Sequence, residues 1–475
     1  MPLTAPETDF RIQPTETTAH FHFGDPGPLA ALTEAEKVQK SHAWDRKGGA
    51  CSVTAPWREM IASLEQRLVA AALRKLRPSR EAQGVDEAQL DHHVDRPHAK
   101  PAKLREARFS DFPGVAELKQ RWGLGEDSLE NWNHLWRDNP ALCHVQTPMG
   151  WVLEAEGRIV GYLGNIPLLY RYGGKTLIAA TASGFVAESK YRAISFSLVS
   201  AFYRQKSVDL YLTTTANEST GKLAQAFGSD PLPQADFDKV LFWILRPHPY
   251  CRAVMKNLNM PRVLTDLSAF FASLALHARR VVRRRRPRVA VNGLEIKEMA
   301  ISEIGDEFHD LWMHKVRETP RLLADRSPSI LQWHFQAPGD TRTARVICCY
   351  KSAELLGYLV IRDDRDQAGG LRRSLVSDLL VRDDDSEVIQ ALCTGAYAHA
   401  KCVGSHVLEL QGFPEKVRSA FSKSKPFMRK YPSSPFYYKA EDRPLHAALA
   451  GSSSWYASPF DGDTTFHAPR PIAFS

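Results

Sequence analysis

The chain has 475 residues, which is too long for one ordinary hydrophobic core and suits two or three domains. Hydrophobic residues make up 43% of it and charged residues 24%, as in globular proteins, and no apolar run reaches the roughly 18 residues that a membrane-spanning helix needs. Residues 1–10 lack the basic and apolar regions of a signal peptide. The seven cysteines include no C-x-x-C pair, so we expect small hydrophobic side chains in a reducing, cytoplasmic compartment.

The net charge of +8 is unevenly distributed along the chain. Seven basic residues lie within ten positions: Arg279, Arg280, Arg283, Arg284, Arg285, Arg286 and Arg288. An apolar segment at helical spacing precedes them. Such a cluster is typical of a solvated surface, of peripheral contact with anionic lipid at a membrane, or of contact with nucleic acid. We expect the apolar face to pack between domains, and the two contacts of residues 279–288 remain open alternatives.

The predicted elements begin with an N-terminal extension, residues 1–103, which holds one helix at 54–76 and a linker. A first folded domain is expected at 104–260. Its expected elements are a strand at 104–107, helices at 112–122 and 129–136, strands at 150–154, 159–167 and 175–188, a helix at 194–205, a strand at 208–214, a helix at 220–227 and a last strand at 240–245. The three consecutive strands are separated by glycine-containing turns, so they form an antiparallel meander.

A connecting helix, apolar and then arginine-rich, is expected at 261–288, and a second domain at 289–446 repeats the order of the first. Its expected elements are a strand at 294–299, helices at 304–315 and around Trp333, strands at 345–350, 355–362 and 373–381, a helix at 388–401 and a strand at 406–411. Residues 447–475 are expected to form a C-terminal tail. The predicted fold class is α+β, with two tandem domains that each contain a mixed, mostly antiparallel sheet flanked by helices, after an irregular N-terminal extension.

The segment from Phe185 to Leu198 leads from a strand into a helix. A tight turn of this kind points several free backbone N–H groups at one spot, and the helix dipole adds partial positive charge there. Such a site binds a pyrophosphate without a lysine, provided that the turn residues are small. Here Ser195 and Ser197 are small, and Arg192 precedes them. The pattern therefore indicates a phosphate-binding turn, with an ordinary polar strand–helix turn as the alternative.

The run Tyr191-Arg192-Ala-Ile-Ser195-Phe-Ser197 resembles the signature of the GNAT superfamily of acyl-CoA N-acyltransferases, Arg/Gln-x-x-Gly-x-Gly/Ala. Both glycines of the signature are serines here. The resemblance implies a GNAT-like fold and an acyl-CoA substrate, acetyl-CoA or another. It also implies these coenzyme-binding residues: Val186, Arg192, Ala193, Ile194, Ser195, Phe196, Ser197 and Asn217.

Two further segments of the first half are similar to the superfamily. Residues 159–167 contain its recurrent Val-Gly, and residues 210–217 resemble its fifth strand, which in the family splays from the fourth and opens a slot for the pantetheine arm. The family's frequent tyrosine acid is replaced by Ala224, and residues 179–185 lack its usual glutamate base. The catalytic residues are therefore unknown from sequence, with Asn217, Glu188 and Glu218 as weak candidates. A helix cap at Asn217 and two solvated glutamates are the competing interpretations.

The second half resembles the same superfamily in strand order only. Its strand–helix turn is acidic, Arg382-Asp-Asp-Asp385, and would repel a pyrophosphate, so we expect a coenzyme site in the first domain alone. No metal site is predicted, because His92, His93 and His98 lie in a linker without a matching set of ligands.

The function predicted from the sequence is an acyl-CoA-dependent N-acyltransferase, similar to an N-acetyltransferase, that acts on an amine-bearing acceptor of unknown identity. A non-catalytic binding protein with a GNAT fold is one alternative, because the serines and Ala224 depart from the family's pattern. An aminoacyl-tRNA-dependent aminoacyl transferase is a second alternative, which the basic cluster would suit. The oligomeric state is not predicted.

Overall fold

A computed structural model describes most of the two predicted domains. The described residues are 101–125, 127–257, 269–270, 273–274, 293–340, 342–365, 370–431 and 435–467. They all belong to one compact unit of the chain, Arg77–Ser475. The extension up to residue 100, the linker histidines and the arginine cluster at 279–288 lie outside the described residues.

The first sheet has the strand order β1-β2-β3-β4-β5-β15-β6, and β9 pairs with β3. Its strands are β1 (Lys103–Glu106), β2 (Gly150–Ala155), β3 (Arg158–Tyr172), β4 (Lys175–Ala187), β5 (Leu210–Thr213), β6 (Asp230–Pro231), β9 (Leu323–Ala324) and β15 (Tyr437–Ala440). Only β4 and β5 run parallel. The helices of this half are α3 (Phe112–Arg121), α4 (Leu129–Trp136), α5 (Phe196–Arg204) and α6 (Glu218–Ala226).

The second sheet has the order β14-β7-β13-β12-β11-β10-β8. Its strands are β7 (Lys239–Ile244), β8 (Glu295–Ala300), β10 (Thr343–Lys351), β11 (Glu354–Arg365), β12 (Arg372–Val381), β13 (Val407–Gln411) and β14 (Phe427–Lys430). Only β12 and β13 run parallel. The remaining helices are α7 (Pro247–Asn257), α9 (Asp306–Arg317), α10 (Pro328–Phe335), α11 (Ser386–Cys402), α12 (Glu415–Ser422) and α13 (Arg443–Ala448). Short 3-10 turns are η3 (Phe109–Asp111), η4 (Pro140–Cys143), η5 (Ser189–Tyr191), η6 (Ile301–Glu303), η7 (Arg382–Asp384) and η8 (Ser452–Ser454).

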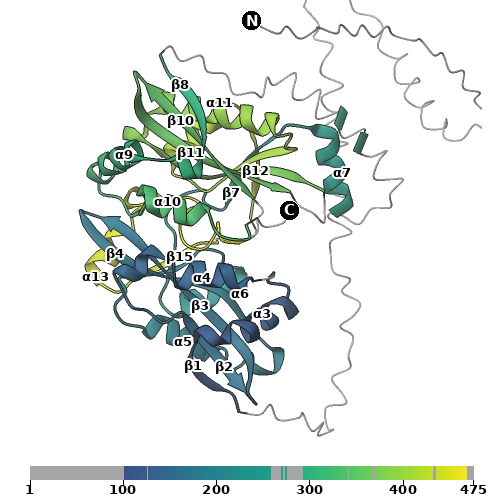
Figure 1. The fold of residues 1–475 in the computed structure, drawn as a ribbon, viewed down its shortest axis with the longest axis vertical. Helices are drawn as coiled ribbons and strands as arrows, with labels where there is room; N and C mark the ends of the chain where they lie inside the picture. Colours follow the sequence, from purple (N-terminus) through teal and green to yellow (C-terminus); the bar gives the residue numbers. More distant parts are fainter. Residues whose placement is uncertain are drawn as a thin grey trace, which may run out of the picture. The chain divides into compact units, whose positions relative to one another are not determined.

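The predicted α+β class is confirmed, because two mixed, mostly antiparallel sheets are flanked by helices (Figure 1). The predicted repeat of element order is also present: strand, two helices, three-strand meander, helix and strand occur in each half. Within the described residues, no helix is long and apolar enough to cross a membrane.

One strand of each half belongs to the sheet of the other half. The strand expected at 240–245 as the last strand of the first domain is β7, and it pairs with β13 and β14 in the second sheet. In return, β15 pairs with β5 and β6 in the first sheet. The placement of β7 corrects the sequence interpretation. Hydrophobic alternation predicts that a strand exists, but it carries no information about which of two similar sheets accepts that strand.

Both faces of each sheet are covered, so neighbouring strand residues enter different clusters. In β2, Trp151 and Leu153 pack with α5, whereas Val152 packs with α3 and α4. In β10, Cys348 enters the cluster that contains α9 and α10, and Cys349 enters the cluster that contains α11. This alternation follows from the period of two in a strand. The adjacent cysteines therefore serve as small buried side chains on opposite faces, as the sequence suggested.

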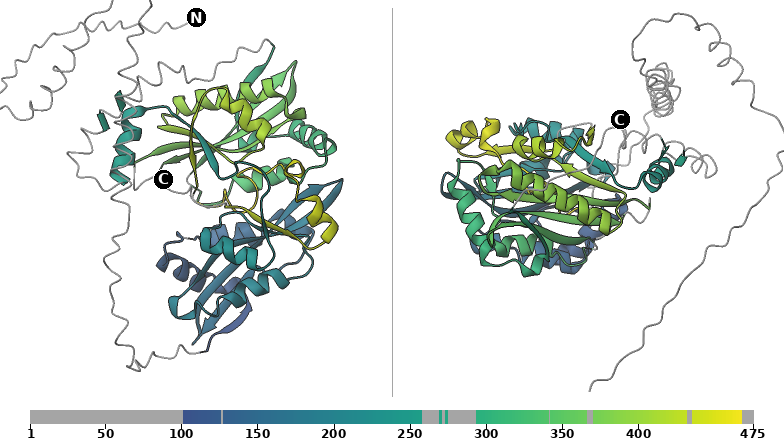
Figure 2. Two further views of the ribbon diagram at one scale, coloured as in Figure 1. Left: turned by 180° about the vertical axis from the view of Figure 1, so that it is seen from behind. Right: turned by 90° about the horizontal axis from the view of Figure 1, so that it is seen from above.

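A shared hydrophobic core joins the two sheets. It contains residues of β3 and β5 from the first sheet, of β11 and β12 from the second, and of the helices α9 and α10. The segment after α13 adds Trp455, Tyr456 and Phe460, which are all at most 2% exposed. Figure 2 shows this C-terminal segment, in yellow, between the two sheets. Residues that the sequence left as a tail are therefore part of the core.

We predict that a buried histidine makes stability depend on pH. His399 of α11 lies between Asp363, 2.9 Å from its Nε2, and Glu298, 3.0 Å from its Nδ1. Burial opposes its positive charge, but the hydrogen bonds to the two carboxylates outweigh this and raise the pKa of His399. Because the pKa of His399 is higher in the folded than in the unfolded state, the protonated histidine stabilises the fold at low pH. This stabilisation is lost as the pH rises through the pKa of His399 in the folded state.

The free energy of unfolding of the wild type, relative to His399→Gln, should therefore fall between mildly acidic and alkaline pH. Urea unfolding across this range measures the difference. A difference that stays constant with pH would contradict the prediction. His446→Gln is the control, because His446 pairs with the exposed carboxylate of Asp230, and ion pairs at the surface contribute little.

Candidate functional site

A notch opens between the parallel strands β4 and β5. The two strands pair only from Ala179–Thr181 with Leu210–Leu212, and β4 then continues to Ala187 without β5 beside it. A β-bulge lies at this point, because Gly184 and Phe185 together oppose Leu163 of β3. Gly184 has a φ of +66°, which glycine adopts without strain. The bulge turns β4 away from its neighbour, since bulges bend the strand that carries them.

The second sheet has a matching notch between β12 and β13. Their parallel pairing ends at Val376 and Leu410. Ser377 is an extra residue in β12, because Val376 and Asp378 pair with consecutive residues of β11. Each half thus has a bulge next to the point where its parallel pair separates.

A single cavity of about 620 Å³ is lined by both notches. The first notch contributes Ser183–Phe185 and Thr213–Asn217, and the second contributes Leu375–Ser377 and Glu409. Arg342, Arg362 and Lys119 also line it, as do residues near the C-terminal end of the described chain. A volume of this size is within the range of small-molecule and cofactor sites. The cavity is therefore the best candidate for the functional site.

The C-terminal segment supplies a carboxylate and an imidazole at the first notch. Asp463 is fully buried and accepts hydrogen bonds from Thr214 at 2.8 Å and from Thr215 at 3.2 Å. The Nε2 atom of His467 lies 2.8 Å from Asp463 Oδ2 and 3.2 Å from Ser183 Oγ. The His467 side chain lines the cavity and is 36% exposed. The pair is thus held in place on one side and accessible on the other.

The carboxyl group of Asp463 carries a negative charge. Burial by itself would raise the pKa of Asp463, but the positive charge of His467 and hydrogen bonds from His467, Thr214 and Ser183 hold that pKa below its ordinary value. The carboxylate is therefore the stable form at neutral pH, and it favours a proton on the Nε2 atom of His467.

Two arginines of the second half fix the backbone of the same segment. Arg342 donates to the carbonyl oxygens of His467 at 2.6 Å and Thr465 at 3.0 Å, and Arg362 donates to Thr465 at 2.5 Å. Both also pair with Asp340. Burial lowers the pKa of each guanidinium to about 10, so both remain charged at neutral pH. The segment is therefore bound to both halves of the molecule.

The predicted coenzyme-binding turn is a contiguous, mostly exposed segment before α5. Arg192, Ala193, Ile194 and Phe196 are exposed, whereas Ser195 is buried. The Ser195 hydroxyl donates to Arg192 O at 2.8 Å, and the Ser197 hydroxyl donates to Ile194 O at 2.7 Å. The serine hydroxyls thus close the turn itself. Val186 lies on β4, where it is 7% exposed and packs against the side covered by α3.

Of the weak catalytic candidates, only Asn217 lines the cavity. It is the N-cap of α6 and accepts from Thr220 N at 2.9 Å, so the capping interpretation is correct for it. Glu188 lies within 4 Å of Arg121, Arg158 and Lys190 and does not line the cavity. Glu218 is exposed, and a hydrogen bond from Lys222 lowers its pKa.

The acidic turn of the second half is closed by its own ion pairs. Asp385 accepts from Glu387 N at 2.7 Å and from Val388 N at 3.2 Å, so it caps α11. Asp384 pairs with Lys315 and Arg321. The Asp385 carboxylate thus occupies the N-terminus of α11, the position that corresponds to the turn before α5 in the first half.

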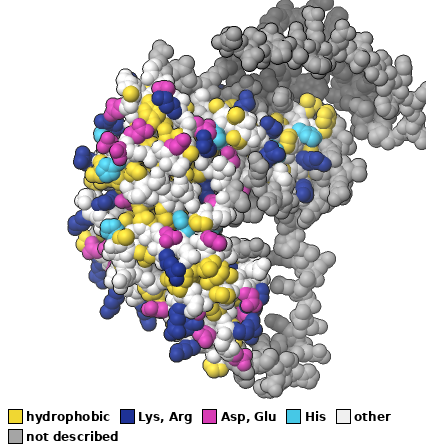
Figure 3. All heavy atoms as spheres, viewed as in Figure 1, with side chains coloured by type: hydrophobic (Ala, Val, Ile, Leu, Met, Phe, Trp, Pro, Cys, Tyr) yellow, Lys and Arg dark blue, Asp and Glu magenta, His cyan; other side chains and the backbone are white. Residues whose placement is uncertain are grey.

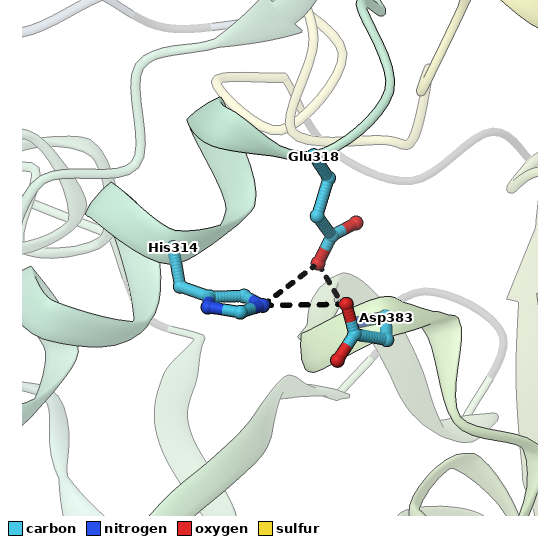
Figure 4. Close-up of side chains that lie close together, drawn as sticks. All are labelled: His314, Glu318 and Asp383. Carbon is cyan, nitrogen blue, oxygen red and sulfur yellow. Dashed lines mark hydrogen bonds and ion pairs between the residues drawn. The ribbon is translucent and has the colours of Figure 1, made fainter.

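A group of three possible metal ligands, His314, Glu318 and Asp383, lies beside this turn (Figure 4). The Oε1 atom of Glu318 accepts from Asp383 N at 2.7 Å, and its Oε2 lies 2.8 Å from Lys315 Nζ. Lys315 places a positive charge next to the group and opposes the binding of a cation. We interpret the group as part of the network that holds the turn.

On the face shown in Figure 3, basic and acidic side chains are interspersed.

Asp463 and His467 were missed by the sequence interpretation. They lie in a segment that was left as a tail, and their spacing of four residues is a weak signal on its own. Nothing in the linear sequence indicates that this segment returns to the end of β5, some 250 residues earlier, to bond Thr214.

No family model matches the sequence, and a search of curated proteins gives no match. Among solved structures, the chain is similar to a GCN5-related N-acetyltransferase from Anabaena variabilis, with 12% identity and a TM-score of 0.47 over 72% of this chain and 73% of that one. It is similar to Eis1 from Mycobacterium abscessus, with 13% identity and a TM-score of 0.42 over 74% and 75% of the two chains. It is also similar to Saccharomyces cerevisiae N-myristoyltransferase with bound myristoyl-CoA, with 12% identity and a TM-score of 0.43 over 72% and 83%. At these identities and TM-scores the structural resemblance assigns no function. A functional assignment therefore has to be argued from the geometry of the cavity.

Proposed function

We propose that the protein is an acyl-CoA-dependent N-acyltransferase that transfers an acyl group to an amine. The observation that carries the proposal is the notch between β4 and β5, which opens into the cavity of about 620 Å³. Where two strands separate, backbone N–H and C=O groups lack a strand partner and can bind an amide-containing chain by strand-like hydrogen bonds. The pantetheine arm of coenzyme A is such a chain, and it would place its thioester at the cavity.

The coenzyme's pyrophosphate would bind the turn before α5. Arg192 is exposed there and supplies positive charge, and the N-terminal end of α5 adds its dipole. The side chain of Asn217, at the other wall of the notch, would contact the pantetheine arm. Backbone amides at the bulge would polarise the thioester carbonyl. The domain boundaries 104–260 and 289–446 remain our proposal for the two halves, with β7 and β15 exchanged between them.

In the reaction, the nitrogen lone pair of the acceptor attacks the thioester carbonyl carbon. A C–N bond forms, the C–S bond breaks, and the coenzyme leaves as a thiolate. One proton leaves the nitrogen and one is taken up by the sulfur, so the products are an amide and a free thiol. No metal is required for this step. The cavity between the two notches provides space for the acceptor beside the thioester.

The proposal predicts that acyl-CoAs bind and that Arg192→Glu weakens this binding at least tenfold. The substitution replaces an attraction between the arginine and the phosphate by a repulsion. A tenfold loss of affinity corresponds to about 1.4 kcal/mol of binding free energy. Calorimetry with acetyl-CoA and longer acyl-CoAs measures the affinity. Arg204→Glu is the matched control, because it makes the same charge change on an exposed residue at the other end of α5. Its affinity should equal that of the wild type.

Failure of every acyl-CoA to bind would refute the proposal. Equal affinity of Arg192→Glu and Arg204→Glu would remove the turn from the site while leaving the notch. Binding without release of free thiol, tested with a panel of amines, would favour the non-catalytic alternative.

A further inference from the structure

The last described turn of the chain, residues 463–467, spans the two walls of the first notch. Asp463 bonds Thr214 and Thr215, which follow β5, and His467 contacts Ser183 of β4. The turn therefore lies beside the point where the parallel strands separate and borders the cavity in which the proposed function places the thioester.

Close packing at Gly462 fixes this position. Gly462 has a φ of +66°, and a Cβ atom there would lie 2.3 Å from Thr214 Oγ1. The next residue, Asp463, donates its backbone N–H to the same hydroxyl at 3.0 Å. Arg342 holds the carbonyl oxygen of His467 at 2.6 Å. The turn is thus held from β5 on one side and from the second half on the other.

The hydrogen bonds of His467 determine which of its nitrogens can act. The carboxylate of Asp463 accepts from Nε2, so the proton of the neutral ring is on Nε2 and the lone pair is on Nδ1. No described residue forms a hydrogen bond with Nδ1, and the ring borders the cavity. An imidazole lone pair in a substrate cavity, with a buried carboxylate behind the ring, is a suitable arrangement for accepting a proton.

We propose that His467, oriented by Asp463, is the general base that takes the proton from the acceptor amine. This inference rests on the proposed N-acyl transfer and supplies the base that the sequence did not reveal. As the C–N bond forms, the proton moves from the nitrogen to Nδ1 of His467. The C–S bond then breaks, and the imidazolium returns the proton to the thiolate, so the enzyme ends unchanged. The imidazolium is stabilised by the charge of Asp463 while it exists.

Ser183 is a neighbour of this pair and not a nucleophile. In a serine–histidine–aspartate relay, the serine and the carboxylate bind opposite nitrogens of the ring. Here both Ser183 Oγ and Asp463 Oδ2 approach Nε2. The amine therefore attacks the thioester directly, and no acyl-serine forms.

The decisive variant is His467→Gln in the full-length protein. The glutamine amide can still donate to Asp463, but it has no basic nitrogen. We expect kcat to fall by about 10²–10⁴-fold, the usual contribution of a general base, with little change in acyl-CoA affinity. The pH profile of kcat should differ between the wild type and the variant, because only the wild type has a basic group at this position. Added imidazole should partly restore the rate of His467→Ala.

His446→Gln is the matched control, because His446 forms another histidine–aspartate pair, 2.9 Å from Asp230, outside the cavity. Its rate and pH profile should equal those of the wild type. Mass spectrometry of the wild type after incubation with an acyl-CoA should detect no acyl group on Ser183.

Three results would overturn the inference. The first is transfer by His467→Gln at the wild-type rate. The second is a nitrogen-15 spectrum of the wild type that places the ring proton on Nδ1. The third is an acyl-serine at Ser183. If the wild type binds no acyl-CoA, the proposed function fails and this inference fails with it. If binding and transfer are intact while the histidine variant is unaffected, only this inference fails.

Discussion

Neither half of the chain should fold when it is produced alone. A break between residues 257 and 293 leaves the first fragment without β15, which lies between β5 and β6, and the second without β7, which lies between β13 and β14. Val240, Leu241 and Trp243 of β7 are each at most 4% exposed, and burying each such side chain contributes about 1.5–3 kcal/mol. Their loss removes a large part of the 5–15 kcal/mol that typically separates folded from unfolded domains.

In a complementary experiment, the full-length protein is folded first and is then cut between the two halves. A protease site inserted between residues 257 and 293 should yield a nicked protein that stays together, because β7 and β15 still pair across the cut. The two fragments should give poorly dispersed amide spectra when alone and native spectra when refolded together. A first fragment that unfolds cooperatively on its own would contradict the expectation and would mean that β15 is dispensable.

Local elements of the fold follow from local sequence patterns. The order of strands and helices in both halves was predictable because alternation and helical spacing are read within ten or so residues. The meander of β2, β3 and β4 was predictable from the turns at Gly157 and Gly174, which have φ values of +70° and +78°. The notch at β4 and β5 was expected from the resemblance, and β4 and β5 do separate after Thr181 and Leu212.

The exchange of strands and the content of the cavity depend on contacts between distant residues. Pairing of β7 with β13 joins residues about 165 positions apart, and Thr214 bonds Asp463 across 249 positions. No local period encodes such a choice. The segment around Trp455 shows no regular hydrophobic period, because its side chains pack between two sheets and do not form one face of a helix or strand. The candidate base lies in that segment, which explains why the sequence left the base unassigned.

Replacing Arg326 by methionine should lower the free energy of unfolding by about 3–5 kcal/mol, the usual cost of breaking a buried ion pair. Arg326 is fully buried and bonds Asp378 through Nε at 3.0 Å and Nη2 at 3.1 Å. It also donates to Ser458 at 3.1 Å and lies 3.6 Å from Asp461. The variant leaves two buried carboxylates without a cation, and it removes one contact, to Ser458, that holds the C-terminal segment.

The loss should also depend on pH. Burial raises the pKa of Asp461 to about 6 even with Arg326 beside it, and without the arginine its proton should be held more tightly still. A carboxyl group with a raised pKa destabilises the fold as it ionises, so the variant should be closest to the wild type near pH 5 and furthest from it near pH 8. Arg345→Met is the control, because Arg345 and Glu298 are 35% and 40% exposed and such pairs contribute about 0–1 kcal/mol. Urea unfolding followed by tryptophan fluorescence measures both variants at both pH values. A loss for Arg326→Met that matches the control, or that grows toward acid pH, would show that the arginine does not compensate these carboxylates.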